Sequence, residues 1–330
     1  MIEGFFDVED ALARMDKKGE FLSRLDAVIN WERFRPTLSR IRKVERKSNA
    51  GRKPYDEILM FKILVLQSLY NLSDEATEMM VLDRLSFRRF LGLSLAAPVP
   101  DATTIWLFRD IAVRMGLIKR LFDDFDRQLT EQGLVARQGS IMDASIIEVP
   151  RQKISKDEKK EIEEKGEAKH WSKNKSNQKD MDAKWTKKND KAYFGYKNHV
   201  NVDVEHKLIR KYEVTDASVH DSRVAEKLLD FTNTSRKVYA DSAYRSEKFS
   251  AYLAMFGFIE KICRKGFRNK QLTERERQGN RSKSRVRARV EHVFGMQKMG
   301  MGDFLVRTIG LARARAKIGL MNLTYNMRRL

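Results

Sequence analysis

Residues 140–150 read SIMDASIIEVP, and this stretch decides the fold class of the chain. It is rich in Ile and Val, which are enriched in β-strands, and it lies between Gly139 and Pro150. We therefore expect a buried central strand here. Asp143 is set among the apolar residues of that strand, and carboxylates are rarely buried unless they are paired or bind a metal. The stretch thus predicts a strand that carries a functional acid.

The segments downstream of this strand predict a mixed sheet. Alternating or apolar patterns predict further strands at residues 193–204, 208–214, 237–240 and 258–263. Helical patterns are found at residues 221–231, 284–301 and 311–328. A run of strands followed by strands that alternate with helices is typical of an α/β fold, in which helices flank a mixed sheet.

The first 135 residues predict short helices joined by tight turns. Residues 58–69 carry a broad apolar face, and Ser73 and Asp101 are placed to cap two further helices. Ser86 is placed to cap a short helix that ends at Gly92. A basic linker at residues 46–53 precedes these helices. Together they could form an all-α DNA-binding domain of the helix-turn-helix kind.

The helix expected after Asp101 is the candidate for DNA contact in this domain. Thr103, Thr104 and Arg109 could reach phosphates or base edges from it. An ordinary helical bundle with a packed Trp106 explains the same pattern equally well, so both interpretations stay open. Two cations of the linker, Arg52 and Lys53, are further candidates for DNA contact.

The length of 330 residues predicts more than one domain. We expect a helical arm and basic linker at residues 1–50, a helical DNA-binding domain at 51–135 and a catalytic domain at 136–330. Residues 151–191 have few aliphatic side chains and many Lys, Glu, Asn and Ser. They predict a solvated basic insertion within the catalytic domain.

The charge of the chain indicates a polyanionic partner. Its 66 Lys and Arg against 46 Asp and Glu leave a formal charge of +20, which favours a nucleic acid. The single Cys263 excludes an intramolecular disulfide and a Cys-rich zinc site. No apolar run reaches membrane-spanning length, and the N-terminus carries no secretory pattern. We therefore expect a cytoplasmic protein that has no membrane partner.

Two further acids stand out because of their surroundings. Asp241 follows the strand expected at 237–240, at the edge where open sheets place ligands, although a turn or helix cap explains it as well. Glu291 lies in a strongly basic helix, where Arg287 and Lys298 fall within roughly 40° of it at about 100° per residue. A plain surface ion pair with Arg287 is the alternative there.

Two aspartates on neighbouring strands and a glutamate on a late helix have the chemistry of a two-metal phosphoryl-transfer site. Hard carboxylate oxygens suit Mg²⁺, which takes its remaining ligands from water and phosphate. Two such ions about 4 Å apart activate the attacking oxygen and stabilise the leaving one. Neighbouring Lys and Arg side chains can then hold a DNA strand without competing for metal.

Eight short motifs, spread over most of the chain, carry a resemblance to a known family. Four lie in the N-terminal part: Gly51-Arg52-Lys53-Pro54-Tyr55, Leu72-Ser73-Asp74-Glu75, Phe87-Arg88-Arg89-Phe90-Leu91-Gly92-Leu93 and Pro100-Asp101-Ala102-Thr103-Thr104. Four lie in the catalytic part: Met142-Asp143-Ala144-Ser145-Ile146-Ile147, Phe194-Gly195-Tyr196-Lys197 with His199, Ala240-Asp241-Ser242-Ala243-Tyr244 and Arg287-Ala288-Arg289-Val290-Glu291-His292. In this order and spacing the chain resembles bacterial insertion-sequence transposases of the family named after insertion sequence five.

That family belongs to the DDE transposases, so the resemblance implies an RNase H-like catalytic fold. It implies that Asp143, Asp241 and Glu291 hold two Mg²⁺ ions, with Mn²⁺ as a substitute. The implied reaction is hydrolysis at the transposon ends, followed by attack of the freed 3′-hydroxyl on target DNA. Terminal inverted repeats and target DNA would be the partners of a homodimer or larger homo-oligomer. The family's helix signature is matched at Arg287, Glu291 and Lys298, but Ser284 stands where it has tyrosine.

Other residues are candidates on weaker grounds. Lys197 and His199 alternate onto one face of a strand and could touch DNA, although an ordinary strand position explains them too. Asp221 could assist metal or DNA binding or could cap a helix. Trp185 could stack on a base or could pin the insertion to the core. The remaining candidates for DNA contact are the helix cations Arg285 and Arg289.

Two other functions stay open at this point. A non-catalytic DNA-binding protein would share the basic surface, but the loss of one of the three acids would mark it, and none is lost here. An RNase H-like nuclease without end specificity would keep the acids and would need no N-terminal recognition domain.

Overall fold

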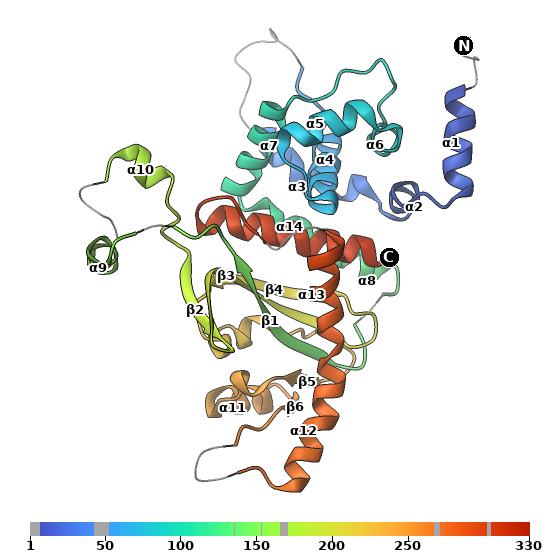
Figure 1. The fold of residues 1–330 in the computed structure, drawn as a ribbon. Coiled ribbons are helices and arrows are strands. Elements are labelled where there is room, and N and C mark those ends of the chain that lie inside the picture. The colour runs from blue at the N-terminus through green and yellow to red at the C-terminus, as the bar shows by residue number, and fades with distance from the viewer. Residues whose placement is uncertain are drawn as a thin grey trace. The chain divides into compact units, whose positions relative to one another are not determined.

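The computed structural model describes residues 7–42, 53–134, 136–152, 154–165, 171–266, 271–301 and 305–330. The chain forms two compact units, one of residues 1–132 and 320–330 and the other of residues 133–319 (Figure 1). The described part of the first unit is helical, and the second unit holds a mixed sheet with helices. The predicted fold class is therefore confirmed. No described helix is long and apolar enough to cross a membrane.

The first unit is assembled around one buried helix. Its α-helices are α1 (Asp7–Lys17), α2 (Phe21–Val28), α3 (Arg35–Leu38), α4 (Glu57–Tyr70), α5 (Asp74–Asp83), α6 (Leu85–Leu91), α7 (Ala102–Arg114) and α8 (Leu117–Glu131). Trp31 and Phe34 pack against Phe61 of α4, with ring centroids 6.0 and 4.9 Å away. Ser68 of α4 hydrogen-bonds Thr324 at 2.8 Å, which ties the end of the chain to this unit.

Polar residues start these helices, as their sequence predicts. Ser73 accepts a hydrogen bond from the Ala76 N–H at 3.1 Å, and Asp101 accepts one from the Thr104 N–H at 2.7 Å. The predicted cap at Ser86 is wrong. α6 begins one residue earlier, after an extended Arg84 whose carbonyl accepts from the Arg88 N–H, so Ser86 lies inside the first turn.

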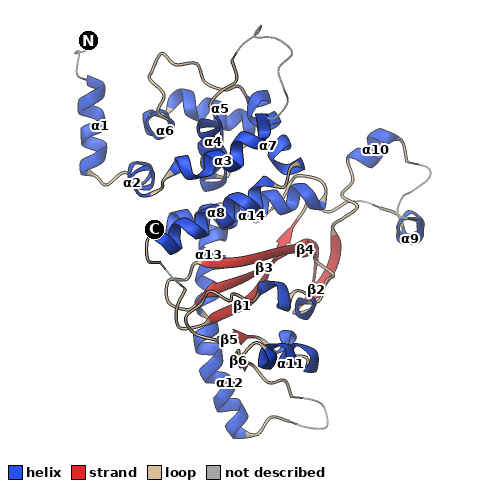
Figure 2. Ribbon diagram, turned by 180° about the vertical axis from the view of Figure 1, so that it is seen from behind, coloured by secondary structure: helices blue, strands red, loops and turns tan. Residues whose placement is uncertain are grey.

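The second unit is built on a six-stranded sheet (Figure 2). Its strands are β1 (Ser140–Glu148), β2 (Lys184–Lys188), β3 (Lys191–Asp203), β4 (Ile209–Asp216), β5 (Lys237–Ala240) and β6 (Ile259–Ile262). β3 pairs antiparallel with β1, β2 and β4, while β1 pairs parallel with β5 and β5 pairs parallel with β6. The strand expected at residues 140–150 is therefore an inner strand of the sheet.

The helices of the second unit differ from the sequence prediction. No helix was expected at residues 156–165, 173–177 or 247–255, and the predictions at 221–231 and 284–301 need correction. The α-helices of this unit are α9 (Lys156–Lys165), α10 (Lys173–Asn177), α11 (Glu247–Met255), α12 (Glu274–Arg287), α13 (Arg289–Gly300) and residues 311–319 of α14 (Leu311–Arg329). The helix expected at residues 221–231 is wrong, because Asp221–Arg223 (η3) and Ala225–Leu228 (η4) are short 3-10 turns and Leu229 is already extended.

The helix expected at residues 284–301 is two helices. α12 begins earlier, because Thr273 and Glu276 form a capping box that starts it. It ends at Arg287, and the Glu291 N–H then bonds to the carbonyl of Ala288, three residues back. That contact is of the 3-10 type and marks the junction between α12 and α13.

One face of the sheet buries a hydrophobic core. Met142 of β1 and Val238 of β5 are fully buried there with Leu228, Tyr244 and Phe249. Because successive residues of a strand point to opposite faces, Asp143 is directed away from this core. The alternation of side chains along β1 thus leaves the acid on the other side of the sheet.

Gly195 of β3 occupies a position that has no room for a side chain. A Cβ there would lie 2.1 Å from the carbonyl oxygen of Ile147 on β1. The obstructing atom is backbone of the neighbouring strand, so we expect Gly195→Ala to destabilise the second unit by about 3 kcal/mol. Thermal denaturation should show a lower Tm. Gly279→Ala in α12, where an added Cβ meets nothing within 4 Å, is the control that should not lower it. Equal Tm values for the two variants would contradict the clash.

Candidate active site

Asp143 and Asp241 are brought together by two parallel strands. The register pairs Ser140 with Val238 and Met142 with Ala240, so the next residue on each strand is one of the two acids. Asp241 directly follows β5 and caps the 3-10 turn Ser242–Tyr244 (η5), accepting a hydrogen bond from the Ala243 N–H at 2.9 Å. The two carboxylates therefore lie at the same edge of the sheet, where β1 continues and β5 stops.

The surroundings of the Asp143 carboxyl disfavour its ionised form. Burial raises its pKa to about 6, and the nearby Asp241 carboxylate adds to the rise. The Ala144 N–H, which donates to it at 2.8 Å, and the Arg287 guanidinium oppose the rise. At neutral pH the group is an ionised, mostly buried carboxylate beside a second one. This arrangement favours the binding of a cation.

Helices α12 and α13 bring the third predicted acid towards this edge without joining it to the pair. Arg287, the last residue of α12, places its Nε 3.8 Å from Asp143 Oδ2. Glu291 lies in the first turn of α13, and its side chain is exposed. The described residues include no group of three or more His, Cys, Asp or Glu placed to hold a metal ion. The structure thus brings together Asp143, Asp241 and Arg287, while the Glu291 side chain is exposed to solvent on α13.

Tyr244 is a member of this cluster that the sequence analysis quoted only as part of a motif. Its side chain is fully buried, and its hydroxyl has no hydrogen-bond partner among the described residues. Burial raises its pKa well above the usual value, and the carboxylates of Asp221, Asp143 and Asp241 raise it further. The hydroxyl therefore lies within electrostatic reach of three aspartates. Its position in the sequence could have indicated this, because Tyr244 ends the single 3-10 turn that Asp241 caps.

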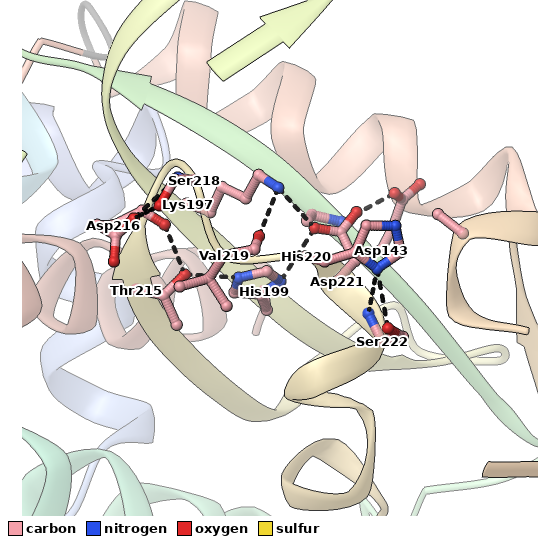
Figure 3. A network of polar contacts seen from close by, with 12 residues as sticks. Asp143, Lys197, His199, Thr215, Asp216, Ser218, Val219, His220, Asp221 and Ser222 are labelled. Atoms are coloured by element: carbon pink, nitrogen blue, oxygen red, sulfur yellow. Dashed lines mark hydrogen bonds and ion pairs between the residues drawn. The ribbon is translucent and has the colours of Figure 1, made fainter. Parts of the chain in front are cut away.

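Lys197 and His199 belong to a buried network around Asp221 (Figure 3). The Lys197 Nζ donates to the Val219 carbonyl at 2.8 Å and to Asp221 Oδ1 at 3.0 Å. His199 is fully buried, with Nε2 2.9 Å from Thr215 Oγ1 and Nδ1 3.8 Å from Asp221 Oδ1. Burial lowers the pKa of His199 to about 4, so its ring is neutral. Both strand residues therefore lie against Asp221, the first residue of the η3 turn.

The other cations predicted to contact DNA lie in varied surroundings. Arg289 donates to the Val204 carbonyl at 2.8 Å, whereas Arg285 and Lys298 are exposed. In the first unit Arg109 is held by both carboxylate oxygens of Asp74, at 2.5 and 2.7 Å, so it acts within that unit.

The remaining residues of the candidate DNA-contact helix, now α7, lie on its surface. Thr103 is exposed, Thr104 is partly buried and Trp106 is 46% exposed, so the alternative with a packed Trp106 is wrong. Of the linker cations, Lys53 is exposed and Arg52 lies outside the described residues.

β1 and its parallel neighbour β5 each place an acid at one edge of a mixed sheet. This is the arrangement expected of a DDE transposase domain. The sequence profile of the family described as Transposase DDE domain matches residues 136–327. The chain therefore belongs to this family, whose members work with divalent metal ions. A second profile, described as Transposase domain (DUF772), matches residues 9–110. The assignment to DDE transposases is confirmed, and the narrower assignment to the insertion-sequence-five family stays a prediction.

A solved structure also resembles the chain. It is a cryo-EM structure of a piggyBac transposase synaptic complex with hairpin DNA, with 12% sequence identity and a TM-score of 0.43. The similarity covers 93% of this chain and 72% of that one.

Proposed function

We propose that the protein is a DNA transposase that binds the terminal inverted repeats of its insertion sequence and catalyses metal-dependent strand cleavage and strand transfer. The observation that carries the proposal is the pairing of Asp143 and Asp241 on adjacent parallel strands inside a transposase DDE domain. Target DNA is the second substrate, and a homodimer or larger homo-oligomer is the acting species.

The donor atoms of this site fit a hard divalent cation. Two carboxylates lie together, and burial raises the pKa of one of them, Asp143, to about 6. The Tyr244 hydroxyl, which has no hydrogen-bond partner within the described ranges, is subject to the same charges. In the proposal Asp143, Asp241 and Glu291 hold two Mg²⁺ ions, which Mn²⁺ can replace. When bound, the ions supply activation of the attacking oxygen and stabilisation of the leaving one.

The remaining residues of the cluster hold and screen these carboxylates. The Ala144 and Ala243 N–H groups each donate to one acid and so restrain its orientation. Arg287 offsets the charge of Asp143 from the side of α12. The exposed Arg285 and Lys298 lie on the same pair of helices, where they are available to DNA phosphates.

The test is cleavage of a DNA duplex that carries the inverted repeats flanking the protein's own gene. With Mg²⁺, wild-type protein should cut at the repeat end and should leave a duplex with a scrambled repeat intact. Equal cutting of both duplexes would replace the transposase proposal by a nuclease without end specificity. Tight binding of the repeat without cutting would leave a DNA-binding protein only.

A further inference from the structure

The hydroxyl of Tyr244 is a fully buried polar group without a hydrogen-bond partner in the described part of the chain. Its ring belongs to the apolar core that holds Met142, Leu228 and Phe249, where a phenylalanine would have the same shape. An unpaired hydroxyl in such a core destabilises the fold, so buried polar groups normally have a protein or solvent partner. The hydroxyl therefore indicates a partner that comes from outside the chain.

Tyr244 is fixed by the same elements that position the acidic pair. It ends η5, the turn that Asp241 caps, and it shares a core with Met142, the residue before Asp143 in β1. Burial raises the pKa of this tyrosine, and both carboxylates of the pair raise it further. The hydroxyl thus lies close behind the pair, on the buried side of β1.

Asp221 is a third acid near this hydroxyl. Its turn, η3, packs against η5. After burial, its carboxylate raises the pKa of Tyr244 more than either acid of the pair does. Lys197 donates to Asp221 Oδ1 at 3.0 Å, and His199 Nδ1 lies 3.8 Å from the same oxygen (Figure 3). These contacts leave Oδ2 able to accept a further hydrogen bond.

A hydroxyl has the chemistry needed between a hydrated cation and a carboxylate. Mg²⁺ keeps several waters when protein carboxylates bind it, and these waters donate hydrogen bonds because their lone pairs face the ion. A tyrosine hydroxyl can accept one such bond and donate its own hydrogen elsewhere. Asp221, held beside the Lys197 ammonium, is an acceptor for that hydrogen.

We propose that Tyr244 is a positioning residue of the metal site. Its hydroxyl accepts a hydrogen bond from the hydration shell of a divalent ion at Asp143 and Asp241, and it donates to Asp221, which Lys197 holds in place. This inference rests on the proposed function, because it takes the acidic pair as the place where the cation binds. Partners of this kind orient the groups around a metal, and their loss typically weakens metal binding tenfold or more.

The experiment measures the Tm of the full-length protein without DNA, first in chelator and then over a titration with MgCl₂. In chelator, Tyr244→Phe should be as stable as wild type or more stable, because the change removes an unpaired buried hydroxyl. With Mg²⁺, wild type should gain Tm, and the variant should need about tenfold more Mg²⁺ for the same gain.

Tyr196→Phe is the matched control. Tyr196 is also fully buried, but its hydroxyl donates to both carboxylate oxygens of Asp180, at 2.7 and 2.8 Å. Its loss should lower the Tm in chelator, because it leaves a buried acceptor unpaired, and should leave the Mg²⁺ dependence unchanged. The two tyrosines are therefore expected to respond in opposite ways.

The possible outcomes separate this role from the proposed function. If wild type gains no Tm with Mg²⁺, the metal site itself is rejected. If wild type gains Tm and Tyr244→Phe follows the same Mg²⁺ dependence, or if Tyr244→Phe is the less stable protein in chelator, only the role of Tyr244 is overturned.

A double variant tests the part that Asp221 plays. Asp221→Asn should also weaken Mg²⁺ binding, and it should cost less affinity in the Tyr244→Phe background than in wild type, because both residues act in one chain of hydrogen bonds. If the two losses simply add, Asp221 acts through its charge alone and the proposed chain is wrong.

Discussion

Asp241→Asn should lower the rate of metal-dependent strand cleavage by about a thousandfold. Bound ions contribute several kcal/mol to transition-state stabilisation, and about 1.4 kcal/mol corresponds to a factor of ten. Asparagine keeps an oxygen that can accept the hydrogen bond from the Ala243 N–H, so the η5 turn should stay folded. The change therefore removes a charge and one metal ligand while it leaves the local structure in place. The measurement is single-turnover cutting of a duplex that carries the terminal repeat.

Glu260→Gln is the matched control for this prediction. Glu260 lies on β6, the strand next to β5, and its carboxylate is 3.8 Å from Arg245. Its removal deletes a negative charge from a neighbouring strand of the sheet without touching the acidic pair. DNA affinity, measured by fluorescence anisotropy, should stay near wild type for both variants. Comparable cutting by Asp241→Asn and Glu260→Gln would remove Asp241 from the metal site.

Five of the six described strands and the acidic pair were accessible from sequence because local patterns determine them, whereas β2 lies in the segment that was predicted to be a solvated insertion. The four residues of β5 were predicted with their bounds, and Asp241 was predicted at their end. The neighbouring placement of Asp143 follows from a parallel pairing that an apolar inner strand favours. Where a strand begins and which face its residues take depend on nearby residues, so a single sequence carries that information.

The surroundings of Lys197 and His199 were not accessible, because their partner is distant in the chain. The alternation of side chains predicted that both residues share one face of a strand, and both lie on β3. Whether the face meets solvent depends on Asp221, which lies 24 positions beyond Lys197 and closes over it in a 3-10 turn. No local pattern indicates that contact, and Asp221 itself reads as a helix cap.

Helix α12 shows a different limit. Its first half, residues 274–280, is ERERQGN, which has no apolar face for a periodicity to detect. The helix begins there because Thr273 and Glu276 satisfy each other's backbone groups, an interaction of three-residue range. The Thr273–Glu276 capping box is a local sequence signal that predicts the beginning of α12. The position of Glu291 depends in turn on the junction at Ala288, which no cap marks.

Asp143→Asn should raise the thermal stability of the metal-free protein at pH 8, although it removes a proposed catalytic group. Burial raises the folded-state pKa of Asp143 to about 6, above the ordinary value of 3.8, so the native protein binds this proton more tightly than the unfolded chain does. The free energy of unfolding therefore falls as pH rises from about 4 to 6 and stays lower above that range. Asparagine is neutral at every pH and avoids this loss.

The expected gain at pH 8 is about 2 kcal/mol, less than the shift alone implies, because the side chain is 21% exposed and loses its contact with Arg287. In Tm this is roughly 5 °C for a unit of this size, measured by calorimetry with a chelator present. The difference between variant and wild type should shrink as pH falls below 5, because the aspartate is then protonated. Glu276→Gln should show the opposite sign at pH 8, since hydrogen bonds from the Thr273 backbone and from Arg264 lower the pKa of Glu276 to about 2.

Adding Mg²⁺ should then reverse the order of the two proteins. A ligand that binds only the native state stabilises it in proportion to its affinity, so wild type should gain Tm with rising Mg²⁺ and Asp143→Asn should gain little. In the metal-free protein the buried, ionised Asp143 carboxylate lowers the free energy of unfolding, and a bound cation should remove this destabilisation. If Asp143→Asn is the less stable protein in chelator at pH 8, the acid is structural, and its burial among Asp241, Tyr244 and Arg287 serves the fold instead of a metal.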